Sequence, residues 1–255
     1  IILPSLLLGN GENWHLPDQI VSSEYLTLEG RKISTSQNYA IWVKKLLEHY
    51  EPDSIRYFFL ANGPEKKDAD FSWREFVHSH NGELLGAYGN FVNRTLMFIV
   101  KYFDGIVPKG INSPSLNNQI DALFVSIGRQ IENGTFKDAI AEIFDFIRYA
   151  NKFFDTKQPW ITRTTDEEAC ENTLYQCVQI IANLAVLLSP FLPFSSEKVC
   201  KWLSINNHWE KQSVPVGYSL PEVEILFQRI DKKVIEIETE KLSSVGLLNS
   251  TAEKE

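Results

Sequence analysis

A short polar loop near the start of the chain carries the residue types best suited to chemistry on a phosphate group. Lys32 is a mobile positive charge that could neutralise a triphosphate, and Gly30 lets the backbone turn sharply just before it. Ser34, Thr35 and Ser36 follow, and their hydroxyl groups can donate hydrogen bonds to phosphate oxygens. Taken alone, such a stretch is more often an ordinary polar loop, so the downstream sequence has to decide between the two interpretations.

Asn90 and Arg94 form a second candidate site, because residues four apart lie on one face of a helix. The amide of Asn90 both donates and accepts hydrogen bonds, and the planar guanidinium of Arg94 offers several donors. Together they could read the edge of a base and hold a phosphate or a ring face. From spacing alone, the alternative is an Asn–Arg pair on a solvated helix face.

Trp160 is a third candidate. Pro159 precedes it and suits the first turn of a helix, where it would aim the indole outward from a fixed backbone. An indole displayed in this way is a stacking platform for an unpaired base. The alternative is a tryptophan buried in the core.

The elements that position these residues are predicted to be a small mixed segment followed by a bundle of about five helices. Residues 1–8 read as a buried helix end, and the alternation over 19–28 predicts a strand that leads into the polar loop. After Leu226 the sequence becomes rich in Lys and Glu, which predicts a frayed polar tail. Helical spacing covers residues 39–50, 53–60, 72–103, 115–132, 136–155, 165–188 and 194–204.

Composition limits the classes of function. A net charge of −8 excludes a surface that is basic all over, so contact with nucleic acid would need a local patch. Cys170, Cys177 and Cys200 are an odd number without a Cys-x-x-Cys pair, which argues against metal binding and against a disulfide framework and fits the cytoplasm. His78 and His80 lie in a Ser/Asn-rich stretch and are predicted to be surface residues rather than metal ligands.

The opening of the chain has a pattern of its own. It begins with Ile rather than Met and inside an apolar stretch, which predicts a portion of a longer protein. No uninterrupted apolar run reaches the length needed to span a membrane, so we expect no membrane partner.

In their order along the chain, these motifs resemble those of the methionyl-tRNA synthetase family. Residues 32–36, Lys-Ile-Ser-Thr-Ser, look like the second class I signature, the loop usually written KMSKS. The segment around Asp53 and Arg56 looks like the joint between the catalytic and anticodon domains. The matching motifs are residues 24–36, 50–57, 70–73, 89–95, 151–155, 158–160 and 226–231.

The resemblance implies a mainly α fold, an anticodon-binding helix bundle preceded by the tail end of a class I α/β nucleotide-binding catalytic domain. Residues 1–70 would be the end of the catalytic domain with its loop and a stem-contact segment. Residues 71–231 would be the anticodon-binding domain and residues 232–255 a charged tail. The whole enzyme of this family activates methionine with ATP and then esterifies methionine tRNA.

The resemblance also implies a role for each candidate residue of the loop. Lys32, Ser34 and Ser36 would be catalytic, with Lys32 stabilising the charge that develops on pyrophosphate. Arg31 and Thr35 would join Lys32 in binding ATP, with Mg²⁺ as its companion ion.

The partner implied by the resemblance is methionine tRNA, whose CAU anticodon would be read with its bases splayed out. Asn90, Arg94 and Trp160 match the anticodon readers of the family by position. No metal ligand is implied.

Three departures from the family pattern matter. Thr35 stands where the common loop has a second lysine, so one cation is missing. The strand that leads in lacks the histidine that many relatives place near methionine, so no methionine-binding residue is carried over. The sequence also lacks a first class I signature of the His-Ile-Gly-His type, and we therefore expect this chain alone to be inactive and to bind no ATP.

Three alternatives remain open from the sequence. The first is a stand-alone tRNA-binding module. The second is another class I synthetase for an aliphatic amino acid, which would share the loop and a helical anticodon domain. The third is a structural helical adaptor, for which the order of the motifs would have to be accidental.

Overall fold

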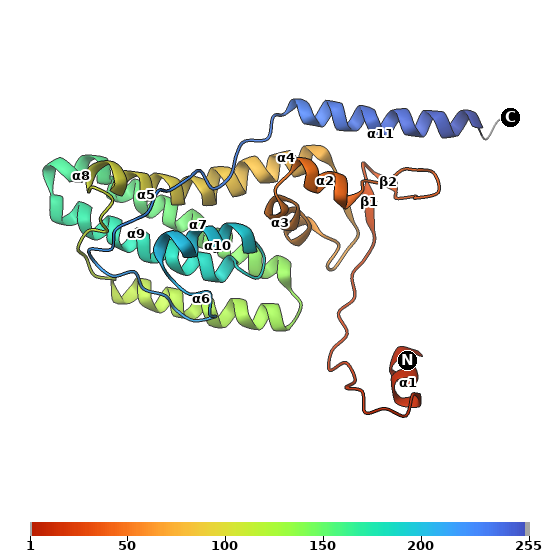
Figure 1. Cartoon of the computed structure of the whole chain (residues 1–255), viewed down its shortest axis with the longest axis horizontal. Coiled ribbons are helices and arrows are strands. Elements are labelled where there is room, and N and C mark those ends of the chain that lie inside the picture. The colour runs from red at the N-terminus through yellow and green to blue at the C-terminus, as the bar shows by residue number, and fades with distance from the viewer. Residues whose placement is uncertain (1, 253–255) are drawn as a thin grey trace.

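The fold is a small mixed sheet with two short helices, followed by a larger helical bundle (Figure 1). The computed structural model describes residues 2–252, with side chains described as far as residue 242. Helices dominate the described part, which confirms the mainly α class predicted from the sequence.

The first part of the chain forms the sheet and its helices. Its elements are α1 (Ile2–Gly9), β1 (Leu26–Leu28), β2 (Arg31–Lys32), α2 (Val43–His49), α3 (Pro52–Asn62) and β3 (Ala69–Phe71). The remaining elements are α4 (Trp73–Ser79), the π-helix η1 (His80–Gly89), α5 (Asn90–Tyr102), α6 (Pro114–Glu132), α7 (Phe136–Lys157), α8 (Pro159–Thr165), α9 (Glu167–Leu188), α10 (Pro193–Leu203) and α11 (Lys233–Ala252).

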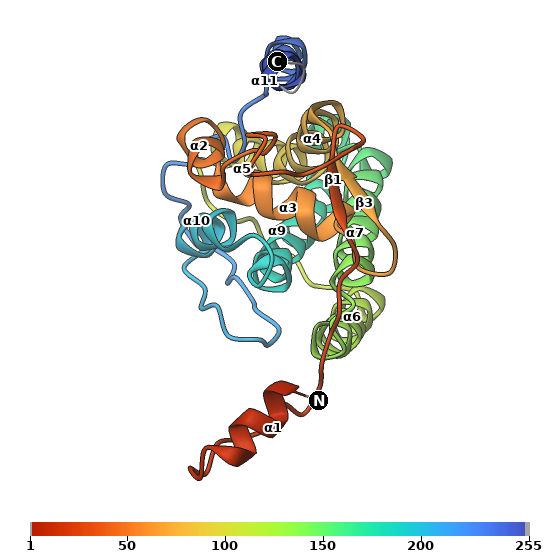
Figure 2. The same cartoon turned by 90° about the vertical axis from the view of Figure 1, so that its right-hand side faces the viewer.

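The sheet has the strand order β2-β1-β3, and Figure 2 shows β3 beside β1. Strand β1 pairs with β2 in antiparallel and with β3 in parallel orientation, with Leu28 opposite Arg31 on one side and Phe71 on the other. The predicted strand over 19–28 is shortened to Leu26–Leu28, because β3 offers only three residues to pair with.

A single long helical run, α4–η1–α5, connects the two parts of the molecule. It covers the helix predicted over 72–103, and at 1.5 Å per residue it is roughly 45 Å long. Its first turns contribute Trp73 and Phe76 to a small aromatic core that also holds Phe58 and Phe71. Its later turns belong to the large core of the bundle. The π-helical turn between them was not predicted.

Helix α9 is the centre of the bundle. Every residue from Cys177 to Leu188 is buried, as expected of a helix that is apolar on nearly all sides. Two buried amides on it are satisfied by the backbone of an extended segment. Gln179 exchanges two hydrogen bonds with Val214, at 2.8 and 2.9 Å, and Asn183 does the same with Gln212, at 3.0 and 2.9 Å.

In the segment predicted to be the joint, the side chains of Asp53 and Arg56 reach from α3 to the corner between α9 and α10. Asp53 is buried and accepts hydrogen bonds from the backbone N–H and the hydroxyl of Ser195, at 2.7 and 2.6 Å. Arg56 donates to the carbonyl oxygens of Phe191 and Pro190, at 2.7 and 2.9 Å. These bonds fix the sheet part against the bundle.

Helix α1 departs from the expectation for residues 1–8. The helix is present, but none of its residues is buried, and Leu3, Leu6 and Leu8 are exposed. Figures 1 and 2 show it standing apart from the body at the end of an extended segment. The prediction of a buried helix end was wrong because no described element covers its apolar side chains.

The C-terminal segment also corrects two expectations. His80 was predicted to be a surface residue, but its imidazole is buried between the hydroxyl of Ser54 and the carbonyl of Gln228, at 2.9 and 2.7 Å. The neighbouring Asn81 exchanges two hydrogen bonds with Ile230, at 2.9 and 3.0 Å. Beyond this attachment the chain forms α11 instead of a frayed tail. The last residues of the predicted tail, 253–255, lie outside the described residues.

Within residues 2–252, no helix combines the length and the apolar character needed to cross a membrane. Cys170, Cys177 and Cys200 are free and buried.

Candidate functional site

The predicted phosphate loop begins on a tight two-residue hairpin. Glu29 and Gly30 both have positive φ angles, 46° and 73°, and connect the paired residues Leu28 and Arg31. A hairpin turn of this kind needs positive φ at both central residues, which explains the glycine.

The base of this loop is fixed to the start of the long helix. The carboxylate of Glu29 accepts a hydrogen bond from the backbone N–H of Trp73 at 2.8 Å. The carboxylate of Asp70, on β3, accepts from the N–H of Gly30 at 2.8 Å and from the hydroxyl of Thr27 at 2.5 Å. Sequence reasoning missed both acids, because their partners lie about 40 residues away along the chain.

The tip of the loop brings its hydroxyl groups together. Ser34 and Tyr39 exchange backbone hydrogen bonds at 2.9 and 2.8 Å, and the hydroxyl oxygens of Ser34 and Ser36 are 3.2 Å apart. Thr35 is exposed at the turn. The hydroxyl-rich tip is therefore an ordered turn with open access from solvent.

The two cations of the loop are placed differently. The guanidinium carbon of Arg31 lies 4.3 Å from the ring centre of Tyr39, so Arg31 is held against the base of the loop. Lys32 is exposed, and within the described part of the chain it makes no ion pair. Lys32 is thus the cation that a ligand could reach without breaking a protein contact.

Asn90 and Arg94 line one pocket of about 550 Å³ between α5 and α7. The guanidinium of Arg94 donates to the carboxylate of Asp155 and to the backbone carbonyl of Asn151, both at 2.7 Å. Its carbon also lies 4.2 Å from the ring centre of Phe154. Asn90 is exposed, and no hydrogen bond to its amide occurs among the described residues.

Trp160 lies on the next helix, α8. Gln158 adopts a left-handed conformation, with φ of 46°, at the corner between α7 and α8, and Pro159 then opens α8. The indole of Trp160 is 46% exposed, so the alternative of a core tryptophan does not apply. Its ring centre is 6.1 Å from that of Phe154.

Two of the three predicted binding residues lie beside a side chain that was not predicted, Phe154, while Asn90 shares the pocket between α5 and α7 with Arg94. Arg94 contacts the ring of Phe154 from α5, and Trp160 lies beside it from α8. The 151–155 motif contained the signal, because Asn151 and Asp155 lie one helical turn apart on α7. Arg148 also lines the pocket, and its ion pair with Glu83, 65 residues away, could not be read from spacing.

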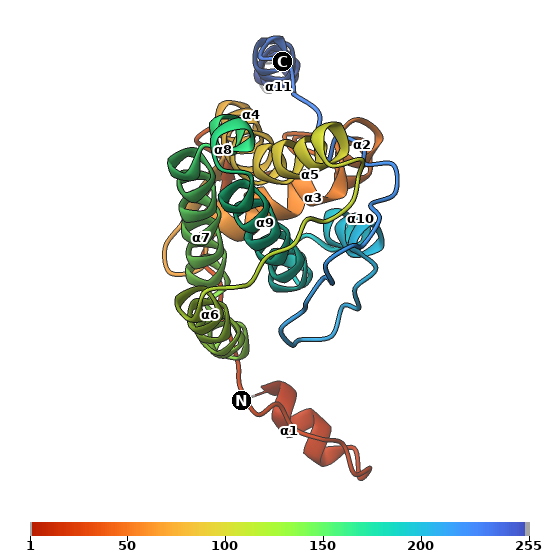
Figure 3. The ribbon, with the colours of Figure 1, turned by 90° about the vertical axis from the view of Figure 1, so that its left-hand side faces the viewer.

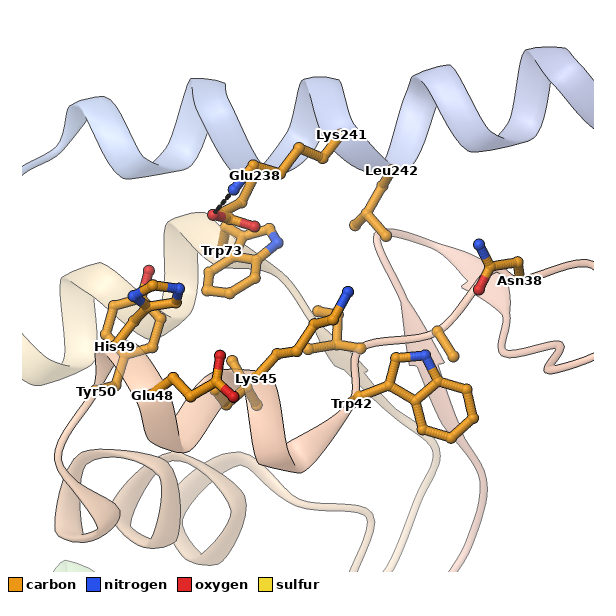
Figure 4. Close-up of a pocket in the computed structure, with 13 residues that line it drawn as sticks. Asn38, Trp42, Lys45, Glu48, His49, Tyr50, Trp73, Glu238, Lys241 and Leu242 are labelled. Carbon is orange, nitrogen blue, oxygen red and sulfur yellow. Dashed lines mark hydrogen bonds and ion pairs between the residues drawn. The ribbon is translucent and has the colours of Figure 1, made fainter.

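A separate pocket of about 460 Å³ lies beneath α11 (Figure 4). Glu238 and Lys241 of α11 form an ion pair at 2.6 Å above Trp73, while Lys45 and His49 of α2 line the opposite side. None of the predicted site residues lines it. Among the described residues, no group of three or more His, Cys, Asp or Glu side chains is arranged to hold a metal ion.

The hairpin loop, most of the long helix and the rest of the bundle lie within segments that match family models of tRNA synthetases, so the class is that of the class I aminoacyl-tRNA synthetases. Residues 1–96 match the family model of class I tRNA synthetases (M), and residues 107–245 match that of the anticodon-binding domain of methionyl tRNA ligase. The chain belongs to the methionyl-tRNA synthetase family, and it comprises the tail of the class I catalytic domain and the anticodon-binding domain.

Individual relatives agree with this assignment. The chain is 56% identical over 243 residues to the methionine–tRNA ligase of Bacillus cereus (strain G9842), and 56% identical over the same length to that of Bacillus mycoides (strain KBAB4). These matches cover 95% of this chain but 44% of each relative, so the chain spans about half the length of the curated relatives it matches.

Solved structures resemble the fold as well. The Mycobacterium tuberculosis methionyl-tRNA synthetase in complex with methionyl-adenylate matches with a TM-score of 0.81 and 26% identity, over 89% of this chain and 47% of that one. Its apo form matches with a TM-score of 0.78 at 24% identity, over 90% and 47% of the two chains.

Proposed function

We propose that this chain acts as the C-terminal part of a methionine–tRNA ligase, which recognises the CAU anticodon of methionine tRNA and supplies the loop for ATP-dependent activation of methionine. The observation that carries the proposal is that Asn90 and Arg94 line one pocket, and that Arg94 and Trp160 both lie beside the ring of Phe154.

The chemistry of that pocket suits a splayed anticodon. An exposed indole offers a face on which an unpaired base can stack, and RNA loops are read largely in this way. The free amide of Asn90 can pair with a base edge in the pocket that Arg94 also lines. A stacking platform beside edge-reading donors supports recognition of a single-stranded loop.

The hairpin loop suits a developing phosphate charge. Lys32 is an accessible cation, and the hydroxyl groups of Ser34 and Ser36 lie next to it at the tip. Preorganised donors of this kind stabilise a transition state because they need no reorganisation when charge develops. We assign ATP binding to Lys32 with support from Thr35. Arg31 would first have to leave the Tyr39 ring.

Further parts of the proposal follow from the family. The longer enzyme would use ATP with Mg²⁺ in the cytoplasm, where thiols such as the free cysteines of this chain stay reduced. We retain the division at residues 70 and 231 between catalytic tail, anticodon-binding domain and charged tail as part of the proposal.

An anticodon transplant tests the recognition half. Filter binding would compare this chain with a methionine tRNA, with an unrelated tRNA, and with the unrelated tRNA after its anticodon is replaced by CAU. The proposal expects the transplant to raise the affinity of the unrelated tRNA close to that of methionine tRNA. A transplant that gains no affinity would place the recognised features elsewhere on the tRNA and overturn this half.

ATP–pyrophosphate exchange tests the loop. The proposal expects no exchange by this chain alone, and in the longer enzyme it expects Lys32→Gln to slow exchange by about 10²–10³-fold, the typical cost of one transition-state donor. Lys44→Gln, at an equally exposed lysine on α2, is the matched control and should leave the rate unchanged. Exchange by the chain alone, or equal rates for both variants, would contradict the assignment.

A further inference from the structure

A second aromatic cluster lies at the far end of α5, and none of its members was a candidate from the sequence. Tyr102 is 40% exposed, and the guanidinium carbon of Arg163 lies 4.3 Å from its ring centre. The ammonium nitrogen of Lys101 is 5.1 Å from the same ring. Arg163 thus lies over an exposed ring, in the last turn of the short helix that also carries Trp160.

This cluster is linked to Trp160 by a chain of neighbouring aromatic rings. The ring of Phe98 is 4.6 Å from that of Tyr102 and 6.5 Å from that of Phe154, which in turn lies 6.1 Å from Trp160. Trp160 and Arg163 are three residues apart on α8 and therefore share a helix face. Figure 3 shows α8 lying beside α5 and the end of α7, so one surface carries both groups.

The charges of the cluster point to an anionic ligand. Within the described residues, neither Arg163 nor Lys101 forms an ion pair with a carboxylate. Arg94 and Arg148, in the neighbouring pocket, are both paired with acids. In a chain of net charge −8, two exposed cations on an aromatic surface are a local patch of the kind that binds nucleic acid.

We propose that Arg163, ordered by its contact with Tyr102, is a second stacking platform that takes an unpaired base next to the base on Trp160. The planar guanidinium can carry a base on the face that Tyr102 leaves open, and Lys101 lies close enough to neutralise an adjacent phosphate. Tyr102 acts as the residue that positions Arg163. This inference rests on the proposed function, because it assumes an anticodon loop at the pocket.

The test uses stem-loops with the CAU anticodon in which single loop nucleotides are made abasic, and measures the affinity of each by fluorescence anisotropy. In the wild-type chain, we expect the loss of a stacked base to lower affinity on the order of tenfold. Trp160→Ala should abolish the penalty at one loop position, and Arg163→Ala should abolish it at a neighbouring position. Arg163→Lys should behave as Arg163→Ala, because it keeps the charge but loses the plane.

Two results would overturn the inference. In the first, Arg163→Ala leaves the penalty at every loop position as it is in the wild type. In the second, Arg163→Lys binds as the wild type does, which would make Arg163 a simple phosphate contact. Tyr102→Phe keeps the ring and serves as the matched control, so it should retain the pattern of penalties.

Failure of the proposed function looks different in the same experiment. A wild-type chain that binds none of the stem-loops, or that shows no penalty sensitive to Trp160→Ala, would remove the anticodon site and this inference with it. If Trp160→Ala abolishes its penalty as expected but Arg163→Ala leaves every penalty as in the wild type, only this inference is overturned and the proposed function stands. Melting curves of the variants should match the wild type, because Trp160 and Arg163 are both exposed.

Discussion

Arg94 is held by contacts that leave its charge largely neutralised before any ligand arrives. Asp155 pairs with it at 2.7 Å, and the carbonyl of Asn151 takes a second donor. The guanidinium face lies on Phe154. Because the charge is already paired, Arg94 is better placed to read a base edge than to attract a phosphate over a distance.

This arrangement predicts the effect of Arg94→Ala. We expect the preference for CAU over an altered anticodon to relax, while the salt dependence of binding changes little. The measurement is the dissociation constant for both RNAs across a salt series. A fall in the salt slope of about 0.7 with unchanged discrimination would instead identify a lost phosphate contact.

Trp160→Ala separates stacking from packing. The indole is 46% exposed, so we expect the variant to lose about 1–3 kcal/mol of tRNA binding and to melt as the wild type does. The contrasting variant is Trp73→Ala, in which the lost side chain is only 2% exposed in the wild type, and it should lose about 3–5 kcal/mol of stability. A large fall in the melting temperature of Trp160→Ala would show that its ring packs in the core.

Among individual residues, the sequence indicated those candidates that a local pattern can reveal. Asn90 and Arg94 follow from helical spacing, and Trp160 follows from the proline before it. Phe154 could not be assigned because its role arises only where three helices meet, although its motif had been noted. Arg163 and Tyr102 are 61 residues apart in sequence, and nothing in either local pattern indicates that they touch.

At the level of helices and strands, side chains at the start of η1 hold in place the segment that precedes α11. The carbonyl of Gln228 can only accept, so Nε2 of His80 donates to it and Nδ1 accepts from the hydroxyl of Ser54. Burial lowers the pKa of His80, against the hydrogen bond to Gln228, which raises it. The lowered pKa favours the neutral imidazole at this attachment.

The lowered pKa of His80 predicts a pH dependence of stability. The unfolded chain binds the proton more readily, so the stabilising contribution is complete above pH 6.5 and is lost as the pH falls below that value towards the folded pKa. Unfolding by denaturant between pH 5 and 8 should show this loss in the wild type and a smaller one in His80→Gln. Parallel pH profiles for the two proteins would disprove the assignment.

Asp53 connects the sheet part to the bundle from a buried position. It accepts two short hydrogen bonds at the start of α10, where the helix dipole also favours a negative charge. We expect Asp53→Ala to lower the free energy of unfolding by about 3 kcal/mol. Ser195→Ala should cost about 1 kcal/mol, because it removes only the hydroxyl and keeps the backbone bond. Equal effects of the two variants in chemical denaturation would contradict this role.

Helices were predicted most accurately where the apolar periodicity of the sequence is strongest. Helices α6, α7, α9 and α10 begin and end within two residues of the predicted limits, because each has a long apolar face and clear breaks. The limits of the strands were harder to predict, because a strand extends only as far as a neighbouring strand pairs with it, and β3 has three residues. The π-turn of η1 and the packing of the 228–230 segment depend on tertiary contacts that no local pattern contains.

In the whole molecule, the long helix α4–η1–α5 joins the two candidate sites. Trp73 at its start holds the base of the hairpin loop through Glu29, and Arg94 lies in its last part, in the pocket between α5 and α7. The two sites are therefore fixed relative to each other by one element and by the Asp53 and Arg56 contacts.

The most direct test is a tryptophan fluorescence titration of the chain with two anticodon stem-loops, one with CAU and one with its first base changed. We predict a fluorescence change with saturable binding to the CAU stem-loop and clearly weaker binding to the altered one, because Asn90 and Arg94 should read the edge of the first base while Trp160 stacks on it. Equal affinity for the two stem-loops, or no binding to either at low salt, would contradict the assignment of this pocket as the anticodon reader.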